Sequence, residues 1–413
     1  MNIAIWIISF LAIAGVIIRP FKVTEAIYAV VGAILLLVFQ LIKPGHAWVG
    51  VVKGLDVYLF LIGMMLLAET AREERLFDWL AAHATVMAKG SATRLFLLIY
   101  LVGVVVTTFL SNDAAAVVLT PAVAAAVKAA KVKKPLPYLL ICAFIANAAS
   151  FVLPISNPAN LVIYGTHMPP LMHWLGQYGL PSVCAIVVTY FALHFTQRSC
   201  FKTKLETNIN IPNLSQGGKT ALIGIVATAV VLLAASAFGI QLGLPTAVTG
   251  VITSAIVIIR SKKNPLVVIK GVSWSVLPLV AGLFVIVEAL NQTGLVQHLT
   301  SILNHGISQS ITGTVWIGAG AIAVVCNLMN NLPVGLIAGN VINVGHAPEV
   351  VKSAVLIGVD LGPNLSITGS LATILWLVAL RREGQTISAW AFLKLGSIVM
   401  TLALIAALAS LWI

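Results

Sequence analysis

The sequence predicts an all-α polytopic membrane protein, and three features of the chain indicate this class. Of its 413 residues 60% are hydrophobic and only 9% are charged, and the mean hydropathy is +1.05. A soluble protein of this size would carry about a quarter charged residues. A span needs ~20 apolar residues to cross ~30 Å of hydrocarbon, and runs of that length recur from end to end, as in TALIGIVATAVVLLAASAFG from Thr220.

We expect about ten transmembrane helices, two re-entrant hairpins and two broken helices. The hairpins, 95–127 and 311–345, are apolar stretches with polar residues at mid-length. The broken helices, 138–166 and 353–380, are interrupted by Pro, Gly and Asn, residues that end or kink a helix. The other spans are predicted at 2–18, 23–42, 54–70, 174–196, 220–238, 242–259, 272–290 and 390–412.

Two halves of the chain repeat the same order of features. A polar stretch, 198–219, is expected to be a cytoplasmic linker between residues 1–197 and 220–413. In each half a helix that follows Lys-Gly and ends in Glu precedes the hairpin, and the hairpin precedes the broken helix. The two Lys-Gly helices are expected to cross in opposite directions. This predicts inverted-topology repeats, which in transporters place the binding site at the repeat interface.

The basic residues predict which side of the membrane is cytoplasmic. The expected topology places all 24 Lys and Arg on one side except Lys43, Lys53 and Lys352. The positive-inside rule makes that side cytoplasmic, so both termini are predicted to face outward. The net charge of +12 is explained in this way, and no nucleic acid is expected as a partner. The stretch 71–94 is an amphipathic surface helix or a solvated loop.

Polar residues gather at four breaks in the apolar pattern, the two hairpin tips and the two broken helices. Irregular backbone at membrane depth is tolerated only where protein buries it or where it lines a water-filled cavity. Helix N-termini at such breaks offer N–H donors to a polar solute. Ser, Asn and Asp are also the preferred N-caps, so capping alone explains any one of them. The predicted substrate-binding residues are Ser111, Asn112, Asn157, Asn160, Asn330, Asn331, Pro363, Asn364 and Thr368.

Two carboxyl groups, Asp113 and Asp360, lie at these breaks. Acidic residues inside a membrane are rare and mark ion or proton pathways. We therefore expect both to carry protons, Asp113 foremost. The same oxygens with nearby amides can alternatively hold Na⁺. Glu69 and Glu288 end the repeat-related Lys-Gly helices and are expected to be interfacial, with a role in coupling as the alternative.

Cys326 lies about one helical turn before the second tip. As a thiolate it could bind a thiophilic solute such as trivalent arsenic, and as a thiol it is a small buried hydrophobe. No other metal ligands and no cofactor are predicted. Neither tip carries Lys or Arg, so a di- or tricarboxylate would lack a neutralising side chain. The polarity suits a small neutral hydroxylated solute or a cation better.

Three motifs, LSNDAAAVVLTP, NNLPVGLIAG and DLGPNLSITGSLATILWL, resemble those of the arsenical-resistance efflux permeases, the arsenite and antimonite pumps of the ArsB type in the ion transporter superfamily. The resemblance covers nearly all of the chain, and Asp360–Leu377 is its most specific part. Sodium-coupled carboxylate carriers of this superfamily have Ser-Asn-Thr at both tips, where this chain has Ser-Asn-Asp and Met-Asn-Asn. The family's functional positions correspond to Asn112, Asp113, Asn330, Asn331, Asp360, Pro363 and Asn364.

The resemblance implies a transporter and not an enzyme. Its substrates would be As(OH)₃ and Sb(OH)₃, exported from the cytoplasm by an elevator-like alternating-access movement. Family members work alone as proton-driven antiporters or with a separate soluble arsenite-stimulated ATPase. Other functions stay open: a sodium-coupled carboxylate carrier or Na⁺/H⁺ antiporter, a passive channel, or an aspartyl protease. The protease would need Asp113 and Asp360 close enough to share a proton, and its usual Gly-x-Gly-Asp setting is absent.

Overall fold

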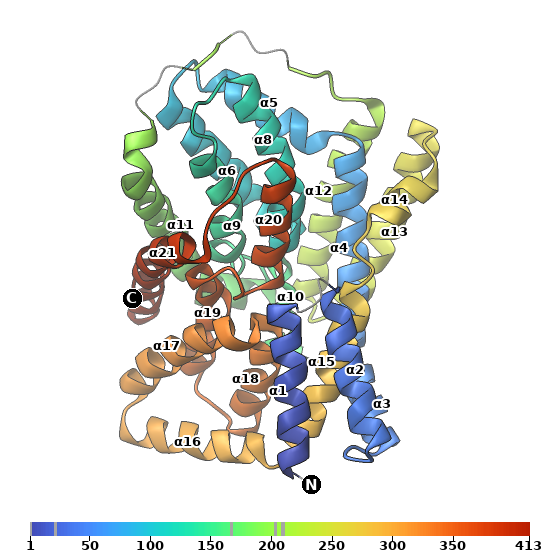
Figure 1. Ribbon diagram of the computed structural model, residues 1–413, viewed down its shortest axis with the longest axis vertical. Coiled ribbons are helices and arrows are strands. Elements are labelled where there is room, and N and C mark those ends of the chain that lie inside the picture. The colour runs from blue at the N-terminus through green and yellow to red at the C-terminus, as the bar shows by residue number, and fades with distance from the viewer. Residues whose placement is uncertain (1, 20–22, 166–167, 202–204, 208–210) are drawn as a thin grey trace.

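The structure is a computed structural model that describes residues 2–19, 23–165, 168–201, 205–207 and 211–413. Every regular element in these ranges is helical (Figure 1), which confirms the predicted all-α class. Within them, eight helices are long and apolar enough to cross a membrane. A ninth span results if α3 (Pro44–Lys53) and α4 (Leu55–Glu73), which are bent by 44° at Gly54, count as one.

The same order of helices occurs in both halves. The first half begins with α1 (Asn2–Ile18) and α2 (Glu25–Val38), which precede α3 and α4. It continues with α5 (Leu76–Met87), α6 (Ala92–Leu110), α7 (Asn112–Ala114), α8 (Thr120–Ala129), α9 (Leu136–Ala148), α10 (Pro158–Tyr164) and α11 (Leu171–Gln197). The second half consists of α12 (Gln216–Ala237), α13 (Gly243–Ser261), α14 (Pro265–Gly271), α15 (Val276–Asn291), α16 (Leu295–Gln309), α17 (Ile311–Met329), α18 (Asn331–Val344), α19 (Glu349–Leu361), α20 (Leu371–Arg382) and α21 (Ala389–Ala409).

Helix pairs occupy both stretches predicted as hairpins, and both stretches predicted as broken helices are interrupted. Residues 92–110, 112–129 and 311–329 are each long and apolar enough to cross a membrane, so the re-entrant course of the hairpins stays a prediction. The first hairpin consists of α6 and the returning arm 112–129, and the second consists of α17 and α18. The short helices α3 and α14 were not expected as separate elements, and the stretch 71–94 contains the helix α5. Three of the counted basic residues, Lys22, Lys202 and Lys204, lie outside the described residues.

Backbone conformation confirms that the halves are structural repeats. Left-handed residues precede α5 and α16, namely Arg75 with φ +59° and Gly294 with φ +85°. The tips of the two hairpins, Ser111 and Asn330, share φ/ψ values of 84°/161° and 71°/152°. In each of these two pairs the second residue lies 219 positions after the first. Figure 1 shows that α4 leads to α5 at the top of the molecule while α15 leads to α16 at the bottom, so the repeats are inverted.

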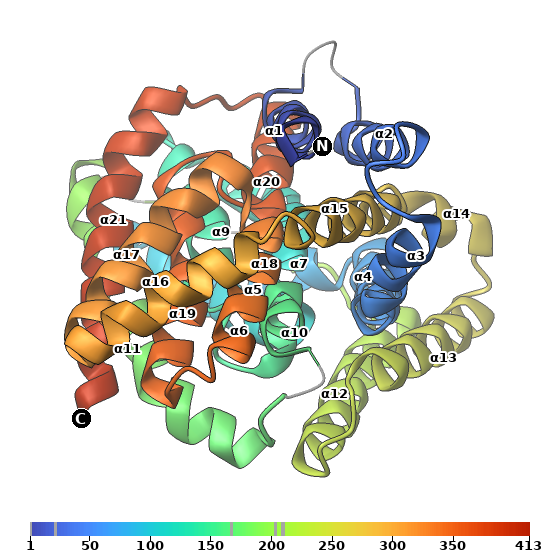
Figure 2. The same ribbon diagram turned by 90° about the horizontal axis from the view of Figure 1, so that it is seen from below.

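The halves are interlocked through two crosswise helix pairs. The most extensive contacts join α4 to α13 and α15 to α2, so each half's central helix packs on the other half. Close approach depends on glycine. A Cβ at Gly63 would collide with the Thr246 carbonyl of α13, and one at Gly282 would meet the backbone of Ala29 in α2. Figure 2 shows α2, α3, α4, α12, α13 and α14 along one side of the molecule. We call α1–α4 and α12–α15 the scaffold.

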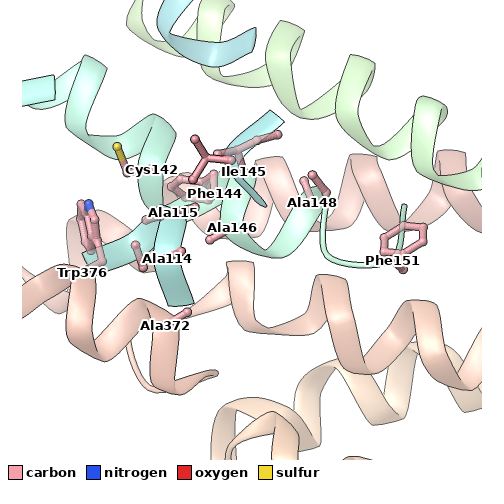
Figure 3. Packing of buried hydrophobic residues seen from close by; sticks show 14 of the residues in the cluster. Ala114, Ala115, Cys142, Phe144, Ile145, Ala146, Ala148, Phe151, Ala372 and Trp376 are labelled. Atoms are coloured by element: carbon pink, nitrogen blue, oxygen red, sulfur yellow. The ribbon is translucent and has the colours of Figure 1, made fainter. Parts of the chain in front are cut away.

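The hairpins and broken helices are interlocked in the same way. The returning arm of the first hairpin packs against α20 of the second half, and α18 of the second hairpin packs against α10 of the first half. Small side chains allow the returning arm of the first hairpin to pack closely against α20. Figure 3 shows Ala114 and Ala115 of the returning arm beside Phe144 of α9 and beside Ala372 and Trp376 of α20. Each hairpin is thus held by a broken helix that comes from the opposite repeat.

The helix pair α4–α13 gives a test of this interlocking. Gly63→Ala places a methyl group against the α13 backbone and should lower the free energy of unfolding by about 1–3 kcal/mol, the usual cost of overpacking. Thermal unfolding of the purified protein in detergent measures the loss. Gly320→Ala is the matched control because its added Cβ meets no atom within 4 Å. An equal loss in both variants would contradict the close contact.

Candidate functional site

The tip of the first hairpin is a strained turn that leaves polar groups without protein partners. Ser111 has φ 84° and ψ 161°, a region that residues other than glycine rarely adopt and that is common at functional sites. Within the described residues, no side chain caps the first turn after it, and the buried Oδ1 of Asn112 has no hydrogen-bond partner. The π-helical turn Ala115–Leu119 follows directly, and such turns are frequent at functional sites.

A cavity of about 60 Å³ lies between this tip and the scaffold. It is lined by Ser111 and Asp113 of the hairpin, by Glu69 of α4, by Ser273 before α15, and by Leu375 of α20, with further apolar residues. The volume is sufficient for roughly four water molecules. In the part of the chain that the structure describes, Asp113 has no hydrogen bond or ion pair, and no Lys or Arg lines the cavity. Asp113 is therefore placed to exchange protons or to bind a solute.

The second tip has the same backbone turn but its donors are engaged. The Asn330 side chain accepts a hydrogen bond from the Leu332 N–H (3.3 Å), and the Asn331 N–H donates to the Gly369 carbonyl (3.0 Å). Asn331 is buried, with 3% of its surface exposed. Neither Asn330 nor Asn331 lines the cavity that holds Asp113. The two tips are thus alike in conformation and different in chemistry.

The two broken helices meet in the interior through reciprocal hydrogen bonds. Asn157, at the break before α10, donates from Nδ2 to Oδ1 of Asp360 in α19 (2.8 Å). Ser370, at the break before α20, donates from Oγ to Oδ1 of Asn147 in α9 (3.3 Å). Ser370 lies 213 positions after Asn157, and Asp360 lies 213 positions after Asn147, so the two bonds join equivalent residues of the two repeats. We call these four residues the crossing, and all of them are buried.

Asn364 extends the crossing instead of facing the cavity. Its Nδ2 donates to the Phe144 carbonyl (3.0 Å), and its Oδ1 accepts from Nδ2 of Asn147 (3.0 Å). Pro363 precedes it in the short 3-10 turn Gly362–Leu365. Both ends of the amide are therefore engaged by α9, and Asn364 is fully buried, so a solute can reach it only if the packing around it opens.

The remaining predicted polar residues hold irregular backbone in place. Asn160 of α10 donates from Nδ2 to the Ser150 carbonyl in the unwound segment (2.9 Å). The Thr368 hydroxyl donates to the Asn327 carbonyl of α17 (3.1 Å). These bonds satisfy carbonyl groups that the helix breaks leave free, as burial demands. The same pattern would result from a purely structural role.

Cys326 is fully buried in the contact between α17 and α19. Its Sγ contacts the Val359 carbonyl at 3.9 Å, and it does not line the cavity beside Asp113. Among the described residues no group of three or more His, Cys, Asp and Glu side chains could hold a metal ion. The surroundings of Cys326 are those of a small apolar side chain.

The structure therefore places predicted residues at two distinct sites, the cavity with Ser111 and Asp113, and the crossing with Asn157 and Asp360. Helix α20 connects them, because Ser370 directly before it belongs to the crossing and Leu375 lines the cavity. About five residues, roughly 8 Å along a helix, separate these points. Sequence reasoning missed Asn147 and gave Glu69 a coupling role only as the alternative to an interfacial one. An isolated Asn within the apolar run CAFIANAAS was the available signal for Asn147.

Interlocked inverted repeats with helix breaks in the interior are the architecture of many membrane transporters. Residues 10–359 match the CitMHS family, described as "Citrate transporter", and the chain belongs to this family. Among its relatives is the arsenical pump membrane protein of Escherichia coli K12, 29% identical over 396 residues, with 91% of this chain and 90% of the relative covered. The Yersinia enterocolitica arsenical pump membrane protein is 28% identical over 353 residues, with coverage of 83% and 82%. These likenesses confirm the predicted resemblance.

Two solved transporter structures share the fold. The YdaH transporter of Alcanivorax borkumensis superposes with a TM-score of 0.58 and 15% identity, and 88% of this chain and 86% of that chain are covered. The antimetabolite efflux pump MtrF of Neisseria gonorrhoeae gives a TM-score of 0.55 and 14% identity, with coverage of 92% and 84%. At these identities the likeness concerns the fold alone.

The crossing yields a prediction on stability. Asn157→Ala removes the amide partner of the buried Asp360 carboxyl and should lower the free energy of unfolding by about 1–3 kcal/mol. The same substitution in an Asp360→Ala background should cost about 0.5–3 kcal/mol less, because only the capping role of Asn157 is then lost. Thermal unfolding in detergent measures both. Equal costs in the two backgrounds would show that the pair contributes nothing.

Proposed function

We propose that the protein exports trivalent metalloids, As(OH)₃ and Sb(OH)₃, from the cytoplasm in exchange for protons. The observation that carries this proposal is Asp113, which lines a water-sized cavity at a strained hairpin tip and has no cationic partner among the described residues. The likeness to arsenical pump membrane proteins over most of the chain supports the substrate class.

The chemistry of the first tip suits a neutral hydroxylated solute. Arsenite near neutral pH is an uncharged trihydroxide, so each hydroxyl can donate and accept. The unpartnered Oδ1 of Asn112 and the Asp113 carboxylate would accept hydrogen bonds from it, and the uncapped N–H groups of the returning arm would donate. Asn331 and Asn364 are buried and do not line the cavity, so they would contact the solute only after the hairpins and broken helices move.

A tricarboxylate fits the same tip poorly, although the family description names citrate. Several negative charges beside Asp113 would repel one another in a site without Lys or Arg. Bound Na⁺ ions would have to compensate. A sodium-coupled carboxylate carrier is therefore the second candidate, and its mark is dependence on a sodium gradient.

Coupling would follow from alternation of Asp113 between protonated and charged forms. A proton bound outside neutralises the carboxyl and crosses with the hairpin, and its release inside restores the charge before substrate binds. The hairpins and broken helices would move as an elevator against the scaffold, since the cavity lies on the boundary between these two parts. Asp360, buried at the crossing, is the second candidate for carrying a proton.

The topology proposed with this function is that of the positive-inside rule. The basic loops would face the cytoplasm of a bacterial cell and both termini would be periplasmic. A soluble ATPase, if one takes part, would bind to the cytoplasmic face. Transport by the purified protein without a partner tests whether such a subunit is required.

Asp113→Asn tests the proposed function directly. Arsenite uptake into everted vesicles or proteoliposomes driven by a pH gradient should fall at least about tenfold, because the amide cannot carry a proton. Size-exclusion chromatography should show a folded protein. Fully retained pH-driven uptake would exclude Asp113 from the mechanism. Citrate uptake that requires sodium in the wild-type protein, without arsenite uptake, would establish the second candidate instead.

Cys326→Ser separates thiol coordination from packing. The buried thiol contacts only protein groups, so the variant should retain arsenite transport within about twofold and lose at most a little stability. The same vesicle assay measures it. A loss as severe as that of Asp113→Asn would show that the sulfur binds arsenic.

A further inference from the structure

The cavity beside Asp113 is lined by a second carboxyl group, which comes from the scaffold. Glu69 belongs to the scaffold helix α4, whereas Asp113 belongs to the first hairpin, and both line the same cavity. Glu69 is 6% exposed. A glutamate at the end of a membrane helix ordinarily reaches the interface. This one faces inward, toward the hairpin tip.

Glu69 also connects the cavity to solvent through an ion pair. Nε of Arg72 donates to Oε2 of Glu69 (2.8 Å), and a second guanidinium nitrogen contacts both Glu69 and Glu73. The Arg72 side chain is 43% exposed and the Glu69 side chain 8%, so the pair joins a buried carboxyl group to the surface of the protein. Arg72 lies in the last turn of α4, so Glu69 is about one helical turn from the end of that helix.

The segment between α14 and α15 leaves space for the Glu69 carboxyl group. Gly271 lies where α14 ends, and a Cβ there would collide with the Glu69 carboxylate. The repeat-related glutamate, Glu288, is placed differently. It pairs with Lys53 at 2.8 Å and does not line the cavity beside Asp113. The inward position of the carboxyl is thus specific to the first repeat.

The other elements around the cavity contribute no further acid or base among the described residues. The link before α15 presents the Ser273 hydroxyl, the hairpin presents Ser111, and α20 presents Leu375. Lys270 precedes Gly271, which lines the cavity, but the Lys270 residue is exposed and does not line it. Asp113 and Glu69 are therefore the two titratable groups that line this cavity, which is large enough for water.

We propose that Glu69 is the stationary proton acceptor for Asp113, which deepens the proposed function and rests on it. The Asp113 O–H bond breaks and its proton passes to a water molecule in the cavity. That water gives a proton to the Glu69 carboxylate, leaving Asp113 charged and Glu69 neutral. Glu69 then releases the proton to solvent and pairs with Arg72 again. The scaffold thus receives the proton from the hairpin only when Asp113 and Glu69 line the same cavity, as they do in this structure.

Transport assays with Glu69→Gln test the role in coupling. In proteoliposomes, uptake of arsenite driven by a pH gradient should fall about tenfold or more, while arsenite exchange at equal pH stays within about twofold of wild type. Glu69→Asp should restore part of the gradient-driven uptake. Glu288→Gln is the matched control and should behave as wild type. Gradient-driven uptake by Glu69→Gln at the level of Glu288→Gln would overturn the proposal.

A second measurement needs no substrate and so distinguishes this inference from the proposed function. Infrared spectra of the purified protein over a pH range should contain a carboxyl band that Asp113→Asn removes. Glu69→Gln should move the midpoint of this band by about one pH unit to lower pH, because a negative charge is lost and Arg72 is left unpaired. Glu288→Gln should leave it unchanged. An unmoved midpoint in Glu69→Gln would refute the inference.

Gly271→Ala keeps the carboxyl group but displaces it, and it covers the case in which Glu69→Gln does not fold. It should lower gradient-driven uptake and move the same infrared midpoint in the same direction. If the wild-type protein does not transport arsenite while the midpoint still depends on Glu69, the proposed substrate is wrong and the proton acceptor stands. Wild-type uptake and midpoint in Gly271→Ala would count against the position assigned to Glu69.

Discussion

The hydrogen bond from Asn157 to Asp360, with its counterpart from Ser370 to Asn147, is the contact on which the interior depends. A helix that breaks inside a membrane exposes N–H and C=O groups that lipid cannot satisfy, and each costs several kcal/mol. Here side chains within each half bond part of this backbone, and Asn364 of the second half also bonds the Phe144 carbonyl of the first. The crossing then joins the two breaks to one another, so the irregular backbone is buried in protein that comes from both repeats.

The same dependence holds for the helices around the crossing. The scaffold pairs α4–α13 and α15–α2 and the contacts of each hairpin with the opposite broken helix all join one repeat to the other. Without a hydrophobic force between helices in lipid, close packing of small residues and polar contacts must supply the association. Gly63 and Gly282 allow that approach at equivalent places. The halves therefore form one structural unit rather than two separable domains.

Function depends on where this symmetry fails. The residue that corresponds to Asp113 in the second repeat is Leu332, and the N–H groups of that tip are bonded to protein. Glu69 faces the cavity at the first tip, whereas its counterpart Glu288 pairs with Lys53 away from it. A symmetric frame thus carries one acidic tip. The proposed exchange of protons for a neutral solute would use this tip alone.

The sequence by itself determined the helical membrane class, the two hairpins, the two broken helices and the identity of both tips, since apolar run length and Pro, Gly and Asn interruptions are local properties. Only the tertiary structure decided which polar groups face one another. It turned Asn364 toward α9, joined Asn147 to Ser370, and brought Glu69 into the cavity of Asp113. Asn147 is more than 200 positions from its partners in the opposite repeat. Their meeting follows from crosswise packing of the repeats, which no local pattern encodes.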